Sequence, residues 1–72
     1  MARGTVKWYN PQKGFGFITP DDGSADVFVH VSAVEVAGYH VLEERQRLEY
    51  EIVEERGRHS AANIRLISAG PE

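Results

Sequence analysis

Gly14-Phe15-Gly16-Phe17-Ile18-Thr19 and Asp26-Val27-Phe28-Val29-His30-Val31 are the two short stretches of the sequence that decide the fold. Successive side chains of a β-strand point to opposite faces of a sheet. In the second stretch the three valines share one face, and β-branched side chains on one face indicate packing against a core. The rings then lie on the other face, which meets water in a protein with a single core. The pattern predicts two adjacent strands that expose an aromatic cluster of Phe15, Phe17, Phe28 and His30.

The opposite arrangement places the three phenylalanines in the core and the valines in water. That arrangement also places Asp26 and His30 inside with the rings, where a charged group without a partner is costly. We therefore favour the exposed aromatic cluster, and a contiguous exposed apolar patch usually marks a binding site. Gly14 and Gly16 support this interpretation, because glycine within a strand marks a tight bend or the close approach of another backbone.

The remaining chain also has the pattern of short strands. Strand-like runs are expected at residues 4–10, 14–19, 26–31, 47–53 and 61–67. Turn-forming residues at 21–24 separate the second and third runs, and a hairpin loop at residues 54–59 surrounds Gly57. Five such runs predict an all-β protein, a small antiparallel barrel or sandwich. The side chains expected to point inward in the last two runs are Leu48, Tyr50, Ile52, Ala62, Ile64 and Leu66.

Two segments are less regular. Strict alternation along residues 4–10 places Val6 and Trp8 on one face and Lys7 and Tyr9 on the other. A single tryptophan is more often part of a core than of a binding surface, so alternation alone leaves the position of Trp8 open. Residues 34–47 permit a helical turn or two, and the side chains expected to point inward there are Val34, Val41 and Leu42.

The length, cysteine content and net charge of the chain limit its domain number, its staples and its location. The chain has 72 residues, no cysteine and a formal net charge of −3. We expect one domain at residues 1–67, a flexible C-terminal tail at residues 68–72, and no disulfide or thiolate metal site. No signal peptide and no apolar run of about 20 residues is visible, so a cytoplasmic protein without a membrane partner is expected. A monomer is expected for a closed barrel of this size. Residues 1–20 contain Arg3, Lys7 and Lys13 but no acid, which makes this segment locally basic.

Motifs of catalysis are missing from the sequence. It contains neither a phosphate-binding loop of the G-x-x-x-x-G-K-[ST] type nor a glycine-rich dinucleotide motif. The histidines at 30, 40 and 59 lack the spacing of metal ligands. We therefore expect no catalytic residue, no metal, no cofactor and no small-molecule substrate.

An exposed aromatic face has a direct use in binding nucleic acid. Every base has a π-face, and base–aromatic stacking contributes ~1–3 kcal/mol per base. Lys7 and Lys13 are expected to pair with phosphates beside the rings. Paired bases hide their faces, so the pattern favours single strands. The alternative is a small β-barrel interaction module that holds a proline-rich peptide on the same rings.

Three motifs carry a resemblance to a known family. Gly4 to Asn10 resembles the opening of cold-shock proteins, Lys13 to Ile18 resembles their first ribonucleoprotein motif, and Val27 to His30 resembles their second. The similarity covers residues 3–67. The resemblance to the cold-shock protein family implies a cold-shock domain, which is a five-stranded antiparallel barrel of the OB-fold type. It also implies binding of single-stranded RNA and DNA by an RNA chaperone or a regulator of transcription or translation.

The resemblance also implies roles for single residues. Stacking is implied for Trp8, Phe15, Phe17, Phe28, His30 and Tyr39. Lys7 and Lys13 take phosphates in this scheme, and Asn10 and Asp26 make polar contacts with bases. Secondary candidates are found where the sequence departs from the family: Tyr9 replaces a phenylalanine, Val31 replaces an aromatic residue, and the loop with Arg58 and His59 lacks the usual Gly-Pro.

Overall fold

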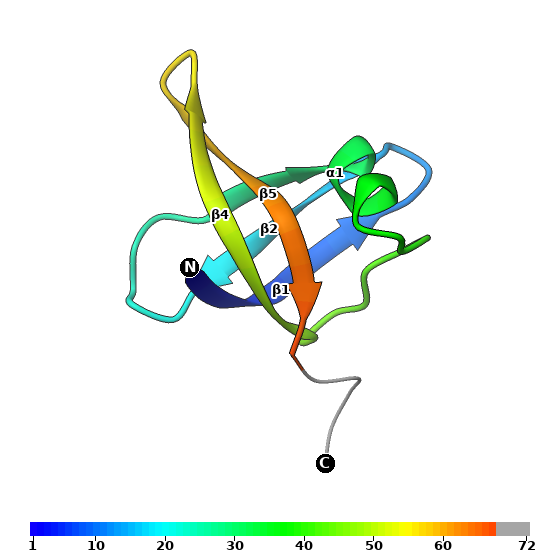
Figure 1. Cartoon of the computed structure of the whole chain (residues 1–72), viewed down its shortest axis with the longest axis horizontal. Coiled ribbons are helices and arrows are strands. Elements are labelled where there is room, and N and C mark those ends of the chain that lie inside the picture. Colours follow the sequence, from blue (N-terminus) through cyan, green and yellow to red (C-terminus); the bar gives the residue numbers. More distant parts are fainter. Residues whose placement is uncertain (68–72) are drawn as a thin grey trace.

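A computed structural model describes residues 1–67, so the tail expected at residues 68–72 lies outside the described residues. The five strands form a closed barrel in the order β1-β2-β3-β5-β4. Figure 1 shows the strands wrapped around one another. Neighbouring strands pair antiparallel except β3 and β5, which pair parallel. The elements are β1 (Ala2–Asn10), β2 (Phe15–Pro20), β3 (Val27–His30), α1 (Val31–Val36), β4 (Arg47–Glu55) and β5 (Arg58–Leu66). The prediction of an all-β, five-stranded barrel is confirmed.

The core fills the barrel with aliphatic side chains from every strand. Val27 and Val29 are buried, and Phe28 between them is not. The valine face of β3 is therefore the core face, as the alternation predicts. The other buried apolar residues are Val6, Ile18, Val34, Leu42, Leu48, Tyr50, Ala61 and Ile64.

A β-bulge in β1 changes which of its side chains face outward. Val6 pairs with Ile18, but the next pair along β1 is Trp8 with Phe17, so Lys7 is an extra residue. An extra residue reverses the alternation that follows it. Trp8 therefore joins Phe17 on the outer face, and Tyr9 turns to pack against the core. Strict alternation, which places Val6 and Trp8 on one face, fails for this reason, and the position of Trp8 that the sequence left open is on the outer face.

Gly16 is required by the close approach of β1 to β2. A Cβ atom on this residue would lie 2.4 Å from the carbonyl oxygen of Trp8 and 2.8 Å from Cα of Tyr9. Both distances are below van der Waals contact, and both atoms belong to the backbone. Only glycine fits at this position, which lies between the two exposed rings of β2.

The β4–β5 hairpin is longer than the sequence suggests. Its strands continue to Glu55 and restart at Arg58, so only Arg56 and Gly57 form the turn. Both have positive φ, at 52° and 78°, which is the geometry of the tight turns that suit twisted hairpins. Figure 1 shows the tip of this hairpin extending beyond the rest of the barrel. The expected loop at residues 54–59 is thus mostly strand.

Two predictions about the hairpin faces are wrong. Ile52, expected inward, is 46% exposed because β4 pairs with β1 only as far as Tyr50 and then leaves the barrel. In β5, Ala61 is buried in place of Ala62. The cause is a register shift opposite Glu49 and Glu51, where Asn63 adopts a φ of 50° and breaks the alternation.

The helix begins earlier than expected. Val31 starts α1 instead of ending β3, and His30 caps the helix by accepting a hydrogen bond from the backbone N–H of Ser32. Val34 and Leu42 are buried as predicted, but Val41 is 42% exposed. No helix within residues 1–67 is long and apolar enough to cross a membrane.

Candidate nucleic-acid interface

Five ring-bearing side chains from three adjacent strands share the outer face of the barrel. We call Trp8 of β1, Phe15 and Phe17 of β2, and Phe28 and His30 of β3 the aromatic platform. Ring centroids are 5.3 Å apart for Trp8 and Phe17, 5.8 Å for Phe17 and Phe28, and 6.3 Å for Phe28 and His30. The strand register explains this grouping, because Phe17 pairs with both Trp8 and Phe28 and Phe15 pairs with His30.

The rings hold one another in place without becoming buried. Trp8 meets Phe15 edge-on at 5.5 Å, and Phe17 meets Phe28 in a T-shaped arrangement. Such pairs contribute about 0.5–1.5 kcal/mol beyond their burial. All four of the larger rings remain partly exposed. The platform is therefore an ordered apolar surface that is open to a flat ligand.

The two lysines of the predicted site differ in their electrostatic surroundings. Lys7 donates a hydrogen bond from Nζ to Oδ2 of Asp26 at 2.9 Å, so its charge is already paired. Lys13 lies in the turn that joins β1 and β2 and has no ion pair within residues 1–67. Of these two lysines, Lys13 carries the charge that is more available to a phosphate.

Asn10 organises the turn between β1 and β2. Its Oδ1 accepts hydrogen bonds from the backbone N–H groups of Gln12 at 2.9 Å and Lys13 at 3.2 Å. An asparagine that binds the backbone two residues further on is a common way to stabilise a turn. The side-chain oxygen of Asn10 thus supports the loop that carries Lys13.

The chain matches a known protein family over nearly all of its described residues. The family described as the 'Cold-shock' DNA-binding domain matches residues 2–67. The chain belongs to this cold-shock domain family. Proteins of this family bind nucleic acid, so nucleic-acid binding is the general activity of the chain. The resemblance to the cold-shock protein family is confirmed.

Curated cold-shock proteins resemble the chain over most of its length. It is 62% identical to the probable cold shock protein y4cH of Sinorhizobium fredii over 66 residues, which covers 89% of this chain and 96% of that protein. It is 58% identical to cold shock protein CspA of Rhizobium meliloti, with 90% and 97% of the two chains covered. For the cold shock-like protein CspE of Escherichia coli the identity is 56%, with 86% and 90% covered.

Two of the candidate residues, Tyr39 and Tyr9, pack against the core in this cold-shock domain, and Val31 directly follows His30 of the platform. Tyr39 packs against the core, and its Oη accepts a hydrogen bond from the backbone N–H of Leu66 at 3.2 Å. Tyr9 packs inward, and its hydroxyl is buried with no hydrogen-bond partner in the described part of the chain. Burial together with the charge of Glu35 raises its pKa. Val31 donates its backbone N–H to Gly14 at the start of α1.

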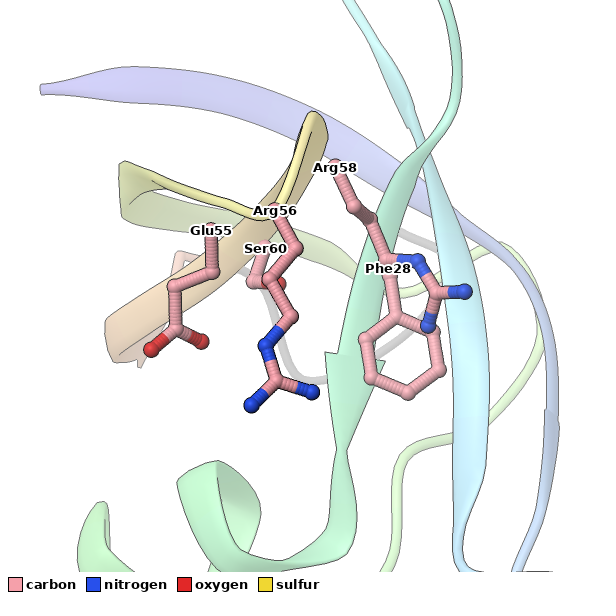
Figure 2. Close-up of a pocket in the computed structure, with 5 residues that line it drawn as sticks. All are labelled: Phe28, Glu55, Arg56, Arg58 and Ser60. Atoms are coloured by element: carbon pink, nitrogen blue, oxygen red, sulfur yellow. The ribbon is translucent and has the colours of Figure 1, made fainter.

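Arg58, which is only a secondary candidate from the sequence, brings a cationic group to the platform from the tip of the β4–β5 hairpin. The guanidinium carbon of Arg58 lies 5.0 Å from the centre of the Phe28 ring. Figure 2 shows this contact, with Arg56 and Glu55 beside it around a hollow of about 470 Å³. The two-residue turn and the pairing of Phe28 with Ser60 bring Arg58 to this position. The sequence leaves open whether Arg56 contributes, because only the tight turn at Gly57 indicates that it lies near Phe28 of β3.

His59 and the other histidines show no metal-binding arrangement. Nε2 of His59 is 3.8 Å from Oε2 of Glu54 across the hairpin. Residues 1–67 contain no group of three or more His, Asp or Glu side chains that is placed to hold a metal ion. The polar groups near the platform of the cold-shock domain are instead Asp26, Arg58 and His59, which line one hollow with Phe15, Phe17 and Phe28.

Proposed function

We propose that the chain binds single-stranded RNA and DNA by stacking bases on the aromatic platform. The observation that carries this proposal is the grouping of Trp8, Phe15, Phe17 and Phe28 on one exposed face, with neighbouring centroids 5.3 to 6.3 Å apart. Each stacked base contributes ~1–3 kcal/mol. A duplex hides the faces of its bases, so it gains none of this energy.

Binding of this kind depends little on charge. The protein carries a net charge of −3, and Lys7 is paired with Asp26. With two to four phosphate contacts, the slope of log affinity against log salt is about −1.5 to −3 for a single strand. We therefore propose that stacking supplies most of the affinity and that sequence selectivity is modest.

The cellular role follows from the preference for unpaired bases. A protein that binds only single strands shifts weak RNA hairpins toward their open form, since it stabilises that form alone. We propose that the chain acts in this way as an RNA chaperone or as a regulator of transcription or translation. In this proposal residues 1–67 form a monomeric, non-catalytic binding domain in the cytoplasm, followed by a tail at residues 68–72.

The test uses Trp8, which is the only tryptophan of the chain. Its fluorescence is titrated with hexathymidine and, as a control, with a stable blunt-ended duplex that leaves no base unpaired, at the same concentration of bases. Quenching by the single strand alone is the expected result, because a base stacked on the platform contacts the indole. Equal quenching by both would contradict the single-strand preference. A response to a proline-rich peptide but to neither oligonucleotide would support the peptide-binding alternative.

Variants identify the rings that take part. Phe17→Ala and Phe28→Ala are each expected to weaken hexathymidine binding by ~1–3 kcal/mol, with the circular dichroism spectrum of the barrel retained. Val36→Ala is the matched control, because Val36 is 83% exposed on α1 and lies outside the platform. If the two phenylalanine variants unfold while Val36→Ala folds, the rings serve the core and not a ligand.

A further inference from the structure

Arg58 and Phe28 together form a wall between two hollows of the surface. The first hollow, shown in Figure 2, is lined by this pair with Glu55, Arg56 and Ser60. The second, of about 440 Å³, lies over the platform and is lined by the pair with Phe15, Phe17, Asp26 and His59. Arg58 therefore faces the surface on which bases are proposed to stack.

The second hollow combines an aromatic surface with polar groups of opposite sign. Three phenylalanine rings supply the apolar area, Asp26 supplies hydrogen-bond acceptors and Arg58 supplies donors. The face of a flat ligand in this space contacts aromatic rings, and its edges reach the Asp26 carboxylate and the Arg58 guanidinium group. The lining of the hollow can therefore distinguish bases by the donors and acceptors at their edges, in addition to stacking on their faces.

Both polar groups have capacity left for a ligand. Within the described part of the chain, Arg58 makes no ion pair, and its contact with the face of Phe28 leaves its N–H donors without hydrogen-bond acceptors. Asp26 uses Oδ2 to bind Lys7 at 2.9 Å, whereas Oδ1 accepts no hydrogen bond within residues 1–67. Guanidinium and carboxylate groups can each form two parallel hydrogen bonds with a planar partner.

We propose that this hollow prefers guanine, with Arg58 donating to O6 and N7 and Asp26 accepting from N1–H and the N2 amino group. This inference rests on the proposed single-strand binding and assigns a base preference to the same surface. Guanine alone joins an edge of two acceptors to an edge of two donors. Adenine and cytosine present an amino donor where guanine has O6, and thymine or uracil lacks N7 and the second donor.

The stacking site need not compete with Arg58. The guanidinium group lies over Phe28, and the Phe17 ring is nearly perpendicular to the Phe15 ring, at an interplanar angle of 89°. A single base in this hollow therefore stacks on Phe15, which lines the hollow beside Phe28. A base stacked there presents its edge to Arg58. The bidentate pairing of arginine with guanine is the commonest base-specific contact of proteins with nucleic acid.

The experiment compares oligonucleotides that differ at one position. Hexathymidine is modified with a single dG, dA or dC at each position in turn, and dissociation constants are measured by Trp8 fluorescence. We expect dG at one position to tighten binding about tenfold, which is 1.4 kcal/mol and lies low in the range for a bidentate pair. Neither dA nor dC is expected to do so. Replacing that dG by 7-deazaguanine, which lacks N7, or by hypoxanthine, which lacks the N2 amino group, should reduce the gain.

Variants test the two residues. Arg58→Lys retains the charge but loses the planar donor pair, so the gain from dG, measured against hexathymidine with the same variant, should disappear. Asp26→Asn should also reduce the gain. Arg56→Ala is the matched control, because Arg56 comes from the same hairpin but lines only the other hollow. This variant should keep the preference for dG.

The outcomes separate this inference from the proposed function. If hexathymidine binds and dG brings no gain at any position, the guanine preference is wrong and single-strand binding stands. The same conclusion follows if the preference persists in Arg58→Lys. If no oligonucleotide binds at all, both proposals fail.

Discussion

Nζ of Lys7 lies 2.9 Å from Oδ2 of Asp26, and this ion pair joins the bulge of β1 to the residue that precedes β3. The pair spans β2, which lies between these two strands in the barrel. A phosphate that binds Lys7 must first compete with the carboxylate. Exposed ion pairs contribute about 0–1 kcal/mol, so such competition is feasible but reduces the gain.

The first prediction compares the two lysines. Lys13→Ala should make the slope of log affinity for hexathymidine against log salt less negative by about 0.7, the effect of one phosphate contact with a single strand. Lys7→Ala should change the slope by less, because its charge is already paired. Titrations at several KCl concentrations measure both slopes. Equal effects of the two substitutions would show that the Lys7–Asp26 pair opens on binding.

Asn10 provides a prediction about the turn between β1 and β2. Asn10→Ala removes the acceptor for the N–H groups of Gln12 and Lys13, and the loss of two hydrogen bonds should lower the free energy of unfolding by about 1–2 kcal/mol. Asn10→Asp keeps an acceptor oxygen and is the control. Urea denaturation measures both variants. Wild-type stability in Asn10→Ala would show that water replaces the side chain without cost.

Tyr50 gives a prediction about stability at high pH. Its hydroxyl is buried and has no hydrogen-bond partner within residues 1–67, and burial, with smaller effects of Asp22 and Asp21, raises its pKa above the ordinary value of 10.0. As the pH rises past 10, the unfolded chain loses this proton while the folded protein keeps it. Stability at neutral pH is therefore unaffected by this group and falls in alkaline solution.

The substitution Tyr50→Phe separates these two effects. At pH 7 it should leave the free energy of unfolding unchanged or raise it by up to about 1 kcal/mol, because an unsatisfied buried hydroxyl is removed. Between pH 10 and 11 the variant should lose less stability than the wild type. Urea midpoints at pH 7, 9, 10 and 11 test both statements. A clear destabilisation at pH 7 would mean that the hydroxyl has a partner, such as a bound water.

Gly16 and Gly23 form a matched pair for the last prediction. Gly16→Ala places a methyl group 2.4 Å from the Trp8 carbonyl oxygen, and the strands must separate, so we expect a loss of at least about 2 kcal/mol in stability. Gly23 has a φ of +82° and no atom within 4 Å of the added carbon, so Gly23→Ala should cost only about 1 kcal/mol of backbone strain. Thermal unfolding compares the two variants, and equal losses would show that β1 and β2 can move apart without cost.

The sequence pattern predicts β2 and β3 well, because each is short, regular and one-sided. Alternation of Val27, Phe28 and Val29 assigns both faces of β3 correctly, and with β2 beside it the exposed aromatic cluster follows. The strand pairs Phe15–His30 and Phe17–Phe28 then complete the platform. These elements depend only on local patterns and on one short turn.

Alternation fails where a strand contains an extra residue. One inserted residue at Lys7 places Trp8 outward and Tyr9 inward, and the irregular backbone at Asn63 exchanges Ala62 for Ala61 in the core. Neither irregularity changes the amino-acid pattern by itself, since it is the partner strand that defines the register. For Trp8 the family resemblance was the better guide, because it placed this residue on the outer surface.

The sequence pattern also does not predict contacts between segments that are distant along the chain. The parallel pairing of Phe28 with Ser60 places Arg58 over the platform, and the hydrogen bond from Leu66 holds Tyr39 against the end of β5. Both depend on how the barrel closes. The net charge of the whole chain was a weak guide as well, because the local pairing of Lys7 with Asp26 decides which cation is available.

The seam between β3 and β5 has a consequence for how the barrel opens. The two strands share one paired position, Phe28 with Ser60, whereas β4 and β5 are paired along most of their length. Breathing of the native state should therefore begin at this seam, and the hairpin should swing outward as a unit with Arg58 at its tip. An oligonucleotide that contacts both Phe28 and Arg58 would hold β3 and β5 together at this seam and slow amide hydrogen exchange in both strands.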